Sequence, residues 1–310
     1  MSITRRTVLV LGAGASQPYG FPLGPALRDI ICAQTTDFRS QITLRSFGFE
    51  RGEIDAFGTA LRHSGFGSID AFLEAEPRFT SLGKVAIALA LLPRERPSAL
   101  FPPAAPKKGH WYEYLLSITA GSLKEWAANR LTIASFNYDR SFEHYFVTVL
   151  AQRFKVSKAD AAKLLRRVEV IHLHGQLGAY PGLGAAPVPY DPDSVSSDDV
   201  RRAARSITTT FEGTADSPFT RVGKRIAQAT RLYFLGFGFA DKSMERLVRY
   251  AGRTPAVVGG TSKGVPDREW ARVTRNFFQG SWVRKRSRSS VLAFLRSDVD
   301  LTYDPGPWVG

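Results

Sequence analysis

Cysteine is nearly absent from this chain, whose 310 residues include only Cys32. A single thiol excludes an intrachain disulfide framework, and it also excludes a zinc site built from cysteines within one chain. Long apolar runs are absent as well. The run Val8–Leu11 stops at a glycine and is too short for the core of a signal peptide, and Val85–Leu92 is too short to span a bilayer. We therefore expect a soluble, cytoplasmic protein with no membrane segment.

Acidic residues are scarce relative to basic ones. The chain has 28 Asp and Glu against 42 Lys and Arg, which gives a net charge of +14 and an isoelectric point near 10.1. Such an excess favours polyanionic neighbours, such as nucleic acid, nucleotides or an acidic partner protein. The charge is spread along the chain, however, and the densest basic run covers only residues 284–288. A solvated basic face is the simpler interpretation, and direct binding of nucleic acid is the alternative.

Hydrophobic residues make up 44% of the chain and aromatic residues 12%, which is enough for a substantial core. Several short aliphatic runs, each followed by a glycine-rich or polar turn, have the composition of strands buried on both faces of a parallel sheet. The pattern predicts an α/β fold, a Rossmann-like parallel sheet flanked by helices. The expected strands are Thr7–Leu11, Leu131–Ser135, Val168–Leu173, Arg231–Leu235 and Pro255–Val258.

The segment between the first two expected strands lacks a strong strand signal. Its patterns are helical or irregular, with a proline-rich break at residues 93–106. We therefore expect a helical insertion at about residues 35–128, within a single domain that spans residues 1–310. A basic C-terminal extension is expected at about residues 263–310, and the Pro-, Gly-, Ser- and Asp-rich stretch 181–199 predicts a loop.

A turn of small residues, Gly12-Ala13-Gly14-Ala15-Ser16, follows the first expected strand. Small residues let backbone N–H groups approach a pyrophosphate at a helix N-terminus, and the hydroxyl of Ser16 can add a bond. The alternative is a tight turn without a ligand. A full dinucleotide-binding fingerprint would have a glycine in place of Gln17, and Asp37, at the spacing of a ribose-binding acid, follows no strand. An ordinary nicotinamide-dependent dehydrogenase is therefore disfavoured.

Polar residues also follow the next two expected strands. Asn137 and Asp139 end one of them, where Asn137 suits holding a ribose hydroxyl or a water, and where both residues are also ordinary in turns and helix caps. His172 and His174 lie on the same face of the next strand, which suggests a pair of metal ligands, but no third ligand accompanies them. His174, before a glycine, suits a general base, and His172 a hydrogen-bonded structural histidine.

Three further turns carry weaker signals. Pro22 belongs to a Gly-x-Pro turn that either closes over the distal half of a dinucleotide or is a plain loop. The turn Gly236–Asp241 follows a strand and suits ribose or phosphate, with a helix cap as its alternative. Ser68–Leu73 has the pattern of a helix cap followed by core residues. Because the carboxyl ends of parallel strands meet at one edge of a sheet, the turns that follow strands should gather there.

The co-occurrence of these motifs in this order resembles the sirtuin-like family, and most of all the bacterial sirtuin-like NADases of antiphage defence. The resemblance covers residues 8–24, 131–145, 168–175 and 231–248, with a weaker block at 256–262. It implies that the chain takes NAD as its substrate without a metal and cleaves it to nicotinamide and ADP-ribose. The chain would then be an NAD glycohydrolase, an NAD-depleting effector of a bacterial antiphage defence system.

The resemblance also implies roles for individual residues. Asn137 and His174 correspond to the catalytic pair, in which Asn137 positions water or ribose hydroxyls and His174 acts as a base. The residues implied in cofactor binding are Gly12, Ala13, Gly14, Ser16, Pro22, Asp139, Gly236, Gly238, Thr261 and Ser262.

Departures from the deacylase sirtuins favour the hydrolytic branch. Those enzymes carry a four-cysteine zinc module, which cannot exist here, and an Asp-Phe-Arg stretch where this chain has Leu23-Gly24. The alternatives are an NAD or ADP-ribose sensor without turnover, a protein ADP-ribosyltransferase or a deacylase. Because an active NADase would exhaust its host's NAD, the resemblance further implies control through a homo-oligomer or a sensor partner protein, including one associated with nucleic acid. The basic residues 268–296 are the expected contact.

Overall fold

The computed structural model describes residues 1–103, 109–209, 217–253, 255–279 and 282–303, and for residues 282–287 it describes the backbone alone. Its centre is a six-stranded sheet in the order β3-β2-β1-β4-β5-β6, and every neighbouring pair is parallel. The expected α/β fold with a Rossmann-like sheet is confirmed. The strands are β1 (Thr7–Leu11), β2 (Leu131–Ser135), β3 (Glu169–His172), β4 (Arg231–Leu235), β5 (Val257–Thr261) and β6 (Trp282–Ser287).

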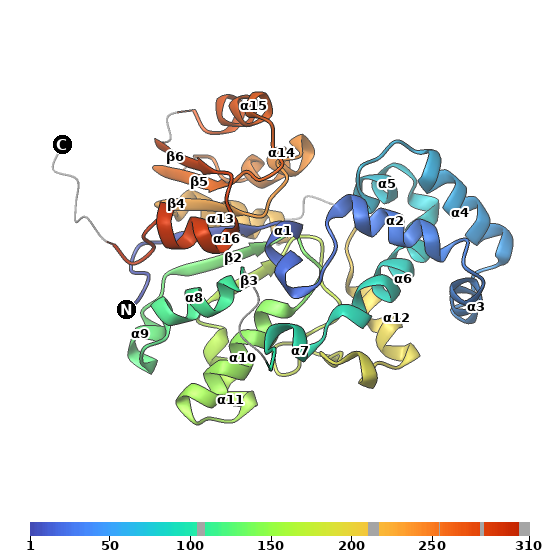
Figure 1. The fold of residues 1–310 in the computed structure, drawn as a ribbon, viewed down its shortest axis with the longest axis horizontal. Coiled ribbons are helices and arrows are strands. Elements are labelled where there is room, and N and C mark those ends of the chain that lie inside the picture. The colour runs from blue at the N-terminus through green and yellow to red at the C-terminus, as the bar shows by residue number, and fades with distance from the viewer. Residues whose placement is uncertain (104–108, 210–216, 254, 280–281, 304–310) are drawn as a thin grey trace.

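Helices cover both faces of the sheet, because side chains of buried parallel strands alternate between two cores. Leu9 and Leu11 of β1 belong to one core, and Val8 and Val10 belong to the other. The first face is covered by α8 (Trp111–Thr119), α10 (Ser141–Phe154) and α16 (Val291–Ala293), and the second by α13 (Pro218–Gln228), α14 (Asp241–Arg249) and α15 (Asp267–Phe277) (Figure 1).

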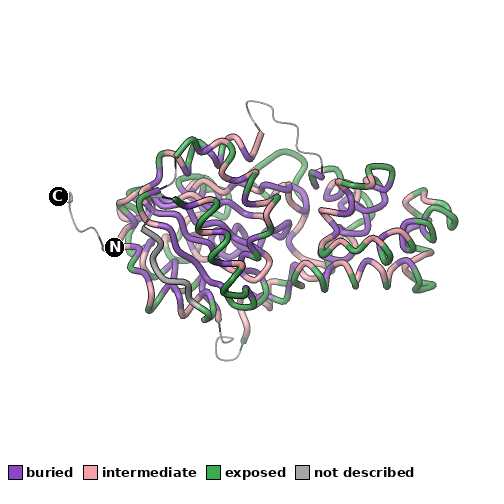
Figure 2. The backbone as a smooth tube through the Cα atoms, turned by 90° about the horizontal axis from the view of Figure 1, so that it is seen from above, coloured by how far each residue is buried: buried purple, intermediate pink, exposed green. Residues whose placement is uncertain are grey.

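A helical lobe extends from one end of the sheet, on the right in Figure 1. Most of it comes from the long connection between β1 and β2, in which the described residues form helices and no strand. Buried and exposed residues alternate along these helices, so that their apolar sides face one another (Figure 2). The lobe consists of α2 (Gly24–Gln34), α3 (Phe38–Ser46), α4 (Arg51–His63), α5 (Ile69–Ala75), α6 (Thr80–Leu91) and α12 (Ser197–Ser206).

Shorter helices complete the described chain, and the C-terminal residues join the sheet. Residues 263–310, expected as a basic extension, include α15 and β6, and β6 pairs with β5. Residues 181–199, expected as a loop, contain a single 3-10 turn before α12 begins. The remaining short helices are α1 (Ala13–Ser16), α7 (Pro97–Leu100), α9 (Leu123–Ala127) and α11 (Lys158–Leu165).

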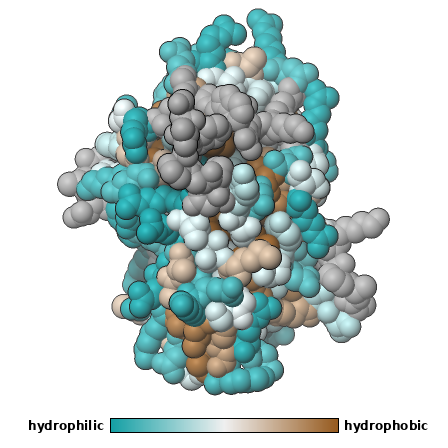
Figure 3. Space-filling view, turned by 90° about the vertical axis from the view of Figure 1, so that its left-hand side faces the viewer, coloured by the Kyte–Doolittle hydropathy of each residue, from teal (hydrophilic) through white to brown (hydrophobic). Residues whose placement is uncertain are grey.

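The surface is largely hydrophilic where Figure 3 shows it, with apolar side chains confined to small areas. No helix in the described parts of the chain is long and apolar enough to cross a bilayer.

A fully buried ion pair joins the start of α10 to the connection between α6 and α7. The guanidinium of Arg140 bonds both carboxylate oxygens of Glu95, and the Arg140 backbone N–H donates to Glu95 Oε1 at 2.9 Å. The same guanidinium donates to the backbone carbonyls of Ala179, Val188 and Pro189. Arg140, which directly follows Asp139, thus joins the start of α10 to Glu95 and to residues 179–189.

We predict that Arg140→Met strongly destabilises the fold, because it leaves the carboxylate of Glu95 buried without a cation. Removing one partner of a buried ion pair costs about 3–5 kcal/mol of unfolding free energy, measurable by urea denaturation. The control is Lys163→Met, since Lys163 pairs with Asp160 on the surface and such pairs are worth about 1 kcal/mol or less. Equal losses in the two variants would show that Arg140 does not tie these segments together.

Candidate functional site

The strand order reverses its direction between β1 and β4. In an open parallel sheet, ligands bind beyond the carboxyl ends of the strands at the point where the strand order reverses. Here the chain runs outward through β2 and β3 and then returns to the other side of β1 with β4. The turns that follow β1 and β4 therefore meet at this point, and both were predicted to bind a dinucleotide.

These two turns lie in direct backbone contact. The Gly12 N–H donates to the Leu235 carbonyl at 3.0 Å, and the Gly14 N–H donates to the Gly236 carbonyl at 2.9 Å. Gly236 has a φ of +60°, and a Cβ there would lie 2.1 Å from the backbone nitrogen of Ala15. The glycines thus allow the two turns to pack together, and the amides of Gly12 and Gly14 are already bonded within the protein.

Asn137 is held against the turn after β1. Its side-chain Nδ2 donates to the Gly12 carbonyl and to Ser16 Oγ, both at 2.9 Å. A carbonyl can only accept, so the amide nitrogen must face Gly12 and the orientation of the amide is determined. Both Nδ2 hydrogens are used in this way, and Oδ1 is the end of the amide that can still accept a bond.

Asp139 continues the same network from the start of α10. Its carboxylate accepts from the Ser141 backbone N–H at 3.1 Å and from the hydroxyl of Ser16. Burial raises the pKa of Asp139 above its ordinary value, although these two hydrogen bonds oppose the rise. Ser16 therefore links Asn137 to Asp139, and all three side chains are buried.

His174 lies beside a carboxylate from the helical lobe. Its Nδ1 is 3.3 Å from Asp70 Oδ1, and the hydroxyl of Tyr138 donates to the same oxygen. Burial opposes the charge of Asp70, but the bonds from His174 and Tyr138 outweigh it and hold the pKa of Asp70 below its ordinary value. Burial and the Asp70 charge raise the pKa of Tyr138 well above its ordinary value, so Tyr138 remains a donor.

His172 points to a different set of partners. Its Nδ1 lies 2.9 Å from the Asn137 carbonyl, and its Nε2 lies 2.8 Å from Glu143 Oε1. Burial opposes a charge on His172, but Glu143 and the carbonyl outweigh it and raise the pKa of His172. A carbonyl and a carboxylate both accept, so this surrounding favours a ring that donates from both nitrogens. His172 is thus bonded as a structural histidine, and its ring nitrogens face other groups than those of His174.

The other predicted binding residues lie around this network at varying distance. Thr261, at the end of β5, accepts from the Gly236 N–H through Oγ1 at 2.7 Å, and the buried Ser262 follows it. Gly238 is exposed in the turn after β4. Pro22 lies half-buried just before α2, after a left-handed Gly20. The structure therefore brings Asn137, Ser16 and Asp139 into one bonded cluster, whereas Pro22 and Gly238 lie in turns outside it.

Asp70 is the site residue that sequence reasoning missed. The stretch Ser68–Leu73 was assigned to capping and core packing, and Ser68 does cap α5 by accepting from the Ala71 N–H at 3.3 Å. An acidic residue in the first turn of a helix is ordinary, because it complements the helix dipole. Only the packing of the helical lobe against the sheet shows that this carboxylate contacts His174.

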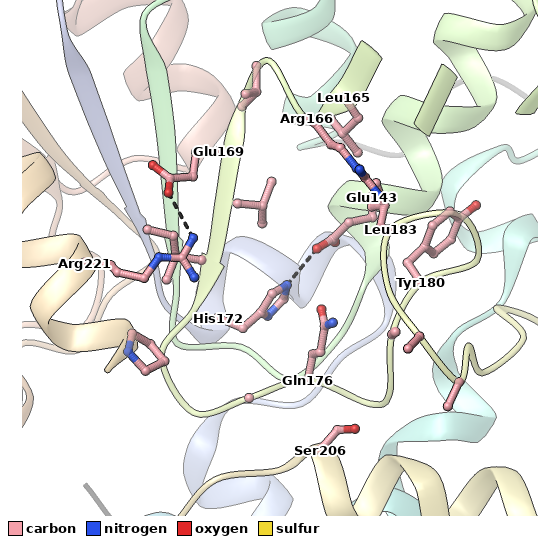
Figure 4. A pocket seen from close by; sticks show the side chains of 18 of the residues that line it. Glu143, Leu165, Arg166, Glu169, His172, Gln176, Tyr180, Leu183, Ser206 and Arg221 are labelled. Carbon is pink, nitrogen blue, oxygen red and sulfur yellow. Dashed lines mark hydrogen bonds and ion pairs between the residues drawn. The ribbon is translucent and has the colours of Figure 1, made fainter. Parts of the chain in front are cut away.

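A separate cavity of about 720 Å³ opens along the outer edge of β3. The pair His172 and Glu143 lies inside it, with Gln176 and Tyr180 nearby (Figure 4). Asn137, His174 and the turn after β1 do not line this cavity. His172 therefore lies between Glu143, which lines the cavity, and the carbonyl of Asn137.

Comparison with known proteins gives no independent assignment. No family model matches the chain, and no curated protein matches it. The chemistry of the site must therefore be argued from its geometry. The geometry provides an oriented amide acceptor at Asn137 and an imidazole beside a carboxylate at His174, both at the carboxyl edge of a Rossmann-like parallel sheet.

We predict that Gly236→Ala lowers the free energy of unfolding by more than about 2 kcal/mol, because the new Cβ needs both a left-handed φ and space occupied by Ala15. Gly238→Ala is the matched control in the same turn, since a Cβ there meets nothing within 4 Å. Its change should stay within roughly 1 kcal/mol. If chemical denaturation gave the two variants the same stability, the close contact between the turns would be refuted.

Proposed function

We propose that this chain is an NAD glycohydrolase of the sirtuin-like kind, which hydrolyses NAD to nicotinamide and ADP-ribose. The observation that carries the proposal is that Asn137 and His174 follow the neighbouring parallel strands β2 and β3, at the carboxyl edge of a sheet with Rossmann-like strand order. The amide is oriented by Gly12 and Ser16, and the imidazole by Asp70. The motif resemblance supports the choice of NAD.

The reaction needs little acid catalysis, because the leaving group is already cationic. The bond between ribose C1′ and the nicotinamide nitrogen breaks, and nicotinamide leaves with the bonding electron pair. Water then adds to C1′ and gives up a proton, so the products are ADP-ribose, nicotinamide and a proton. The protein has to align the bond, stabilise the positive charge that develops on ribose and accept the proton.

Asn137 suits the alignment step. Its Nδ2 is held by Gly12 and Ser16, so Oδ1 is the acceptor for a water or a ribose hydroxyl. An oriented amide oxygen also places partial negative charge near a cationic ribose, which favours the transition state.

His174 suits the proton-accepting step. A carboxylate beside Nδ1 favours the tautomer in which Nδ1 carries the hydrogen and Nε2 carries the lone pair. The ring can then take a proton from water, either directly or through a ribose hydroxyl. Asp70 acts through His174 as a positioning residue, and it compensates the charge that forms on the ring.

The same proposal includes a need for control, since unrestrained turnover would exhaust cellular NAD. Assembly into a homo-oligomer or contact with a sensor protein would supply it, in keeping with a role in antiphage defence. The surplus of basic side chains, 42 against 28 acidic ones, supports a partner that is itself acidic or carries nucleic acid.

Asn137→Ala and His174→Ala are expected to reduce nicotinamide release from NAD by about 100-fold or more, the effect expected when a positioned catalytic group is removed. The assay measures nicotinamide by chromatography over a range of protein concentrations, because assembly could control activity. The matched controls are Asn276→Ala and His63→Ala, which change exposed residues of α15 and α4. A wild-type rate in well-folded Asn137→Ala protein would refute the assignment.

Asp70→Asn is expected to lower kcat by roughly 10- to 100-fold with a smaller change in KM, because the neutral amide no longer holds the tautomer or the charge of His174. Glu74→Gln is the control on the same helix. Glu74 pairs with Arg246 of α14. A higher rate in both variants would show instead that α5 restrains the site, and the positioning role of Asp70 would be wrong.

A further inference from the structure

The cavity along β3 combines a polar interior with basic walls. Its interior includes the buried Glu143 and the half-buried His172, and residues 168–172 at the edge of the sheet form one wall. Figure 4 shows the amide of Gln176 directed into the space beside this pair. With a volume of about 720 Å³, the cavity has the size of a small-molecule site.

Most carboxylates in and around the cavity are already neutralised. Glu143 bonds His172, and Glu169 accepts from both Arg221 and Arg225. Arg202 at the wall pairs with Asp199. These pairs leave little net charge, so the sign of the charge around the cavity depends on the charged lining residues outside them, Arg166 and Arg205.

Two guanidinium groups at the wall have no acidic partner. Arg166 follows α11 and donates to the Gly182 carbonyl at 3.3 Å, and Arg205 lies on α12; both residues are exposed to solvent at the rim of the cavity. Within the described parts of the chain, neither pairs with a carboxylate. Two uncompensated cations from separate elements beside one cavity favour a ligand with at least two negative charges, because guanidinium groups bind phosphate through paired hydrogen bonds.

The interior of the cavity is joined to the candidate catalytic site by one side chain. The ring of His172 bonds Glu143 on one side and the Asn137 carbonyl on the other. An anionic ligand that repels or displaces the Glu143 carboxylate would change the charge balance of His172, and with it the hydrogen bond to the Asn137 carbonyl. Occupancy of the cavity therefore has a direct route to the backbone of Asn137.

We propose that this cavity binds a small phosphate-bearing anion of nucleotide size, held by Arg166 and Arg205, and that its occupancy alters the catalytic site through His172. The binding part stands on the cavity alone. The coupling part rests on the proposed function, and the two are tested separately.

Binding is tested with magnesium-free pyrophosphate and ATP as probes, by isothermal titration calorimetry of the full chain at fixed ionic strength. The double variant Arg166→Gln/Arg205→Gln should weaken binding at least about tenfold, the effect of losing charged hydrogen bonds. Arg249→Gln/Arg275→Gln is the matched control, since it removes the same charge from exposed positions on α14 and α15. Equal weakening in both double variants, or no binding of either probe by the wild type, overturns the site.

The two probes report different features of the site. Binding of pyrophosphate and ATP alike shows that the two arginines recognise phosphate. Binding of ATP alone shows that the apolar side of the cavity, which includes Leu165 and Leu183, contributes as well. Both results support the proposal.

Coupling is tested by the rate of nicotinamide release from NAD with and without a saturating probe. The wild type and the Arg249/Arg275 control should change rate by several-fold, and the Arg166/Arg205 variant should not respond. The same response in all three proteins would place the effect outside the cavity and refute the coupling. If the wild type bound the probe but never cleaved NAD, the proposed function would fail while the binding site stood.

Discussion

The contact between the turns after β1 and β4 is the constraint on which the rest of the site depends. Glycine at positions 12, 14 and 236 lets the two backbones approach within hydrogen-bond distance, and any side chain there would collide. This contact fixes the Gly12 carbonyl and Ser16, which in turn determine how the amide of Asn137 is oriented. Glycines of such turns are usually explained by the approach of a phosphate. Here the close approach of the two turns explains all three glycines, and a ligand would bind beside the two packed turns.

The ion pair of Arg140 and Glu95 supplies the second constraint. Burying two charges is costly unless each finds full compensation, and Arg140 finds it in one carboxylate and three carbonyls. Because Arg140 comes directly after Asp139, the position of the turn that carries Asn137 depends on the ion pair of Arg140 and Glu95, which we call the Arg140 clamp. The clamp also fixes residues 179–189, which follow His174 in the chain. The segments that carry Asn137 and His174 are thus both held in position by the buried guanidinium of Arg140.

The sequence predicted the sheet better than it predicted the site. The strands β1, β2 and β4 lie where expected, because strands buried on both faces are continuous apolar runs with a recognisable composition. The strand β6 was missed, since Trp282–Ser287 lies at the sheet edge and contains three basic residues. Asn137 and His174 follow strand ends and could be named from that position. Asp70 could not, because its distance from His174 depends on how a helical lobe packs 100 residues away in the chain, and no local pattern encodes that packing.

The helix α5 contacts residues that follow three strands of the sheet, β2, β3 and β4. Asp70 contacts His174 and Tyr138, and Glu74 pairs with Arg246 after β4. Asn137 and His174 are less than a tenth exposed beneath these contacts, so a dinucleotide that reaches them must displace part of this cover. The carboxylates of α5 are about one-third exposed, whereas Arg140 and Glu95 are fully enclosed. Partly solvated pairs are worth about 1 kcal/mol or less each, several times less than it costs to break a buried pair. The contacts of α5 would therefore yield first, while the packed turns and the Arg140 clamp keep Asn137 in place.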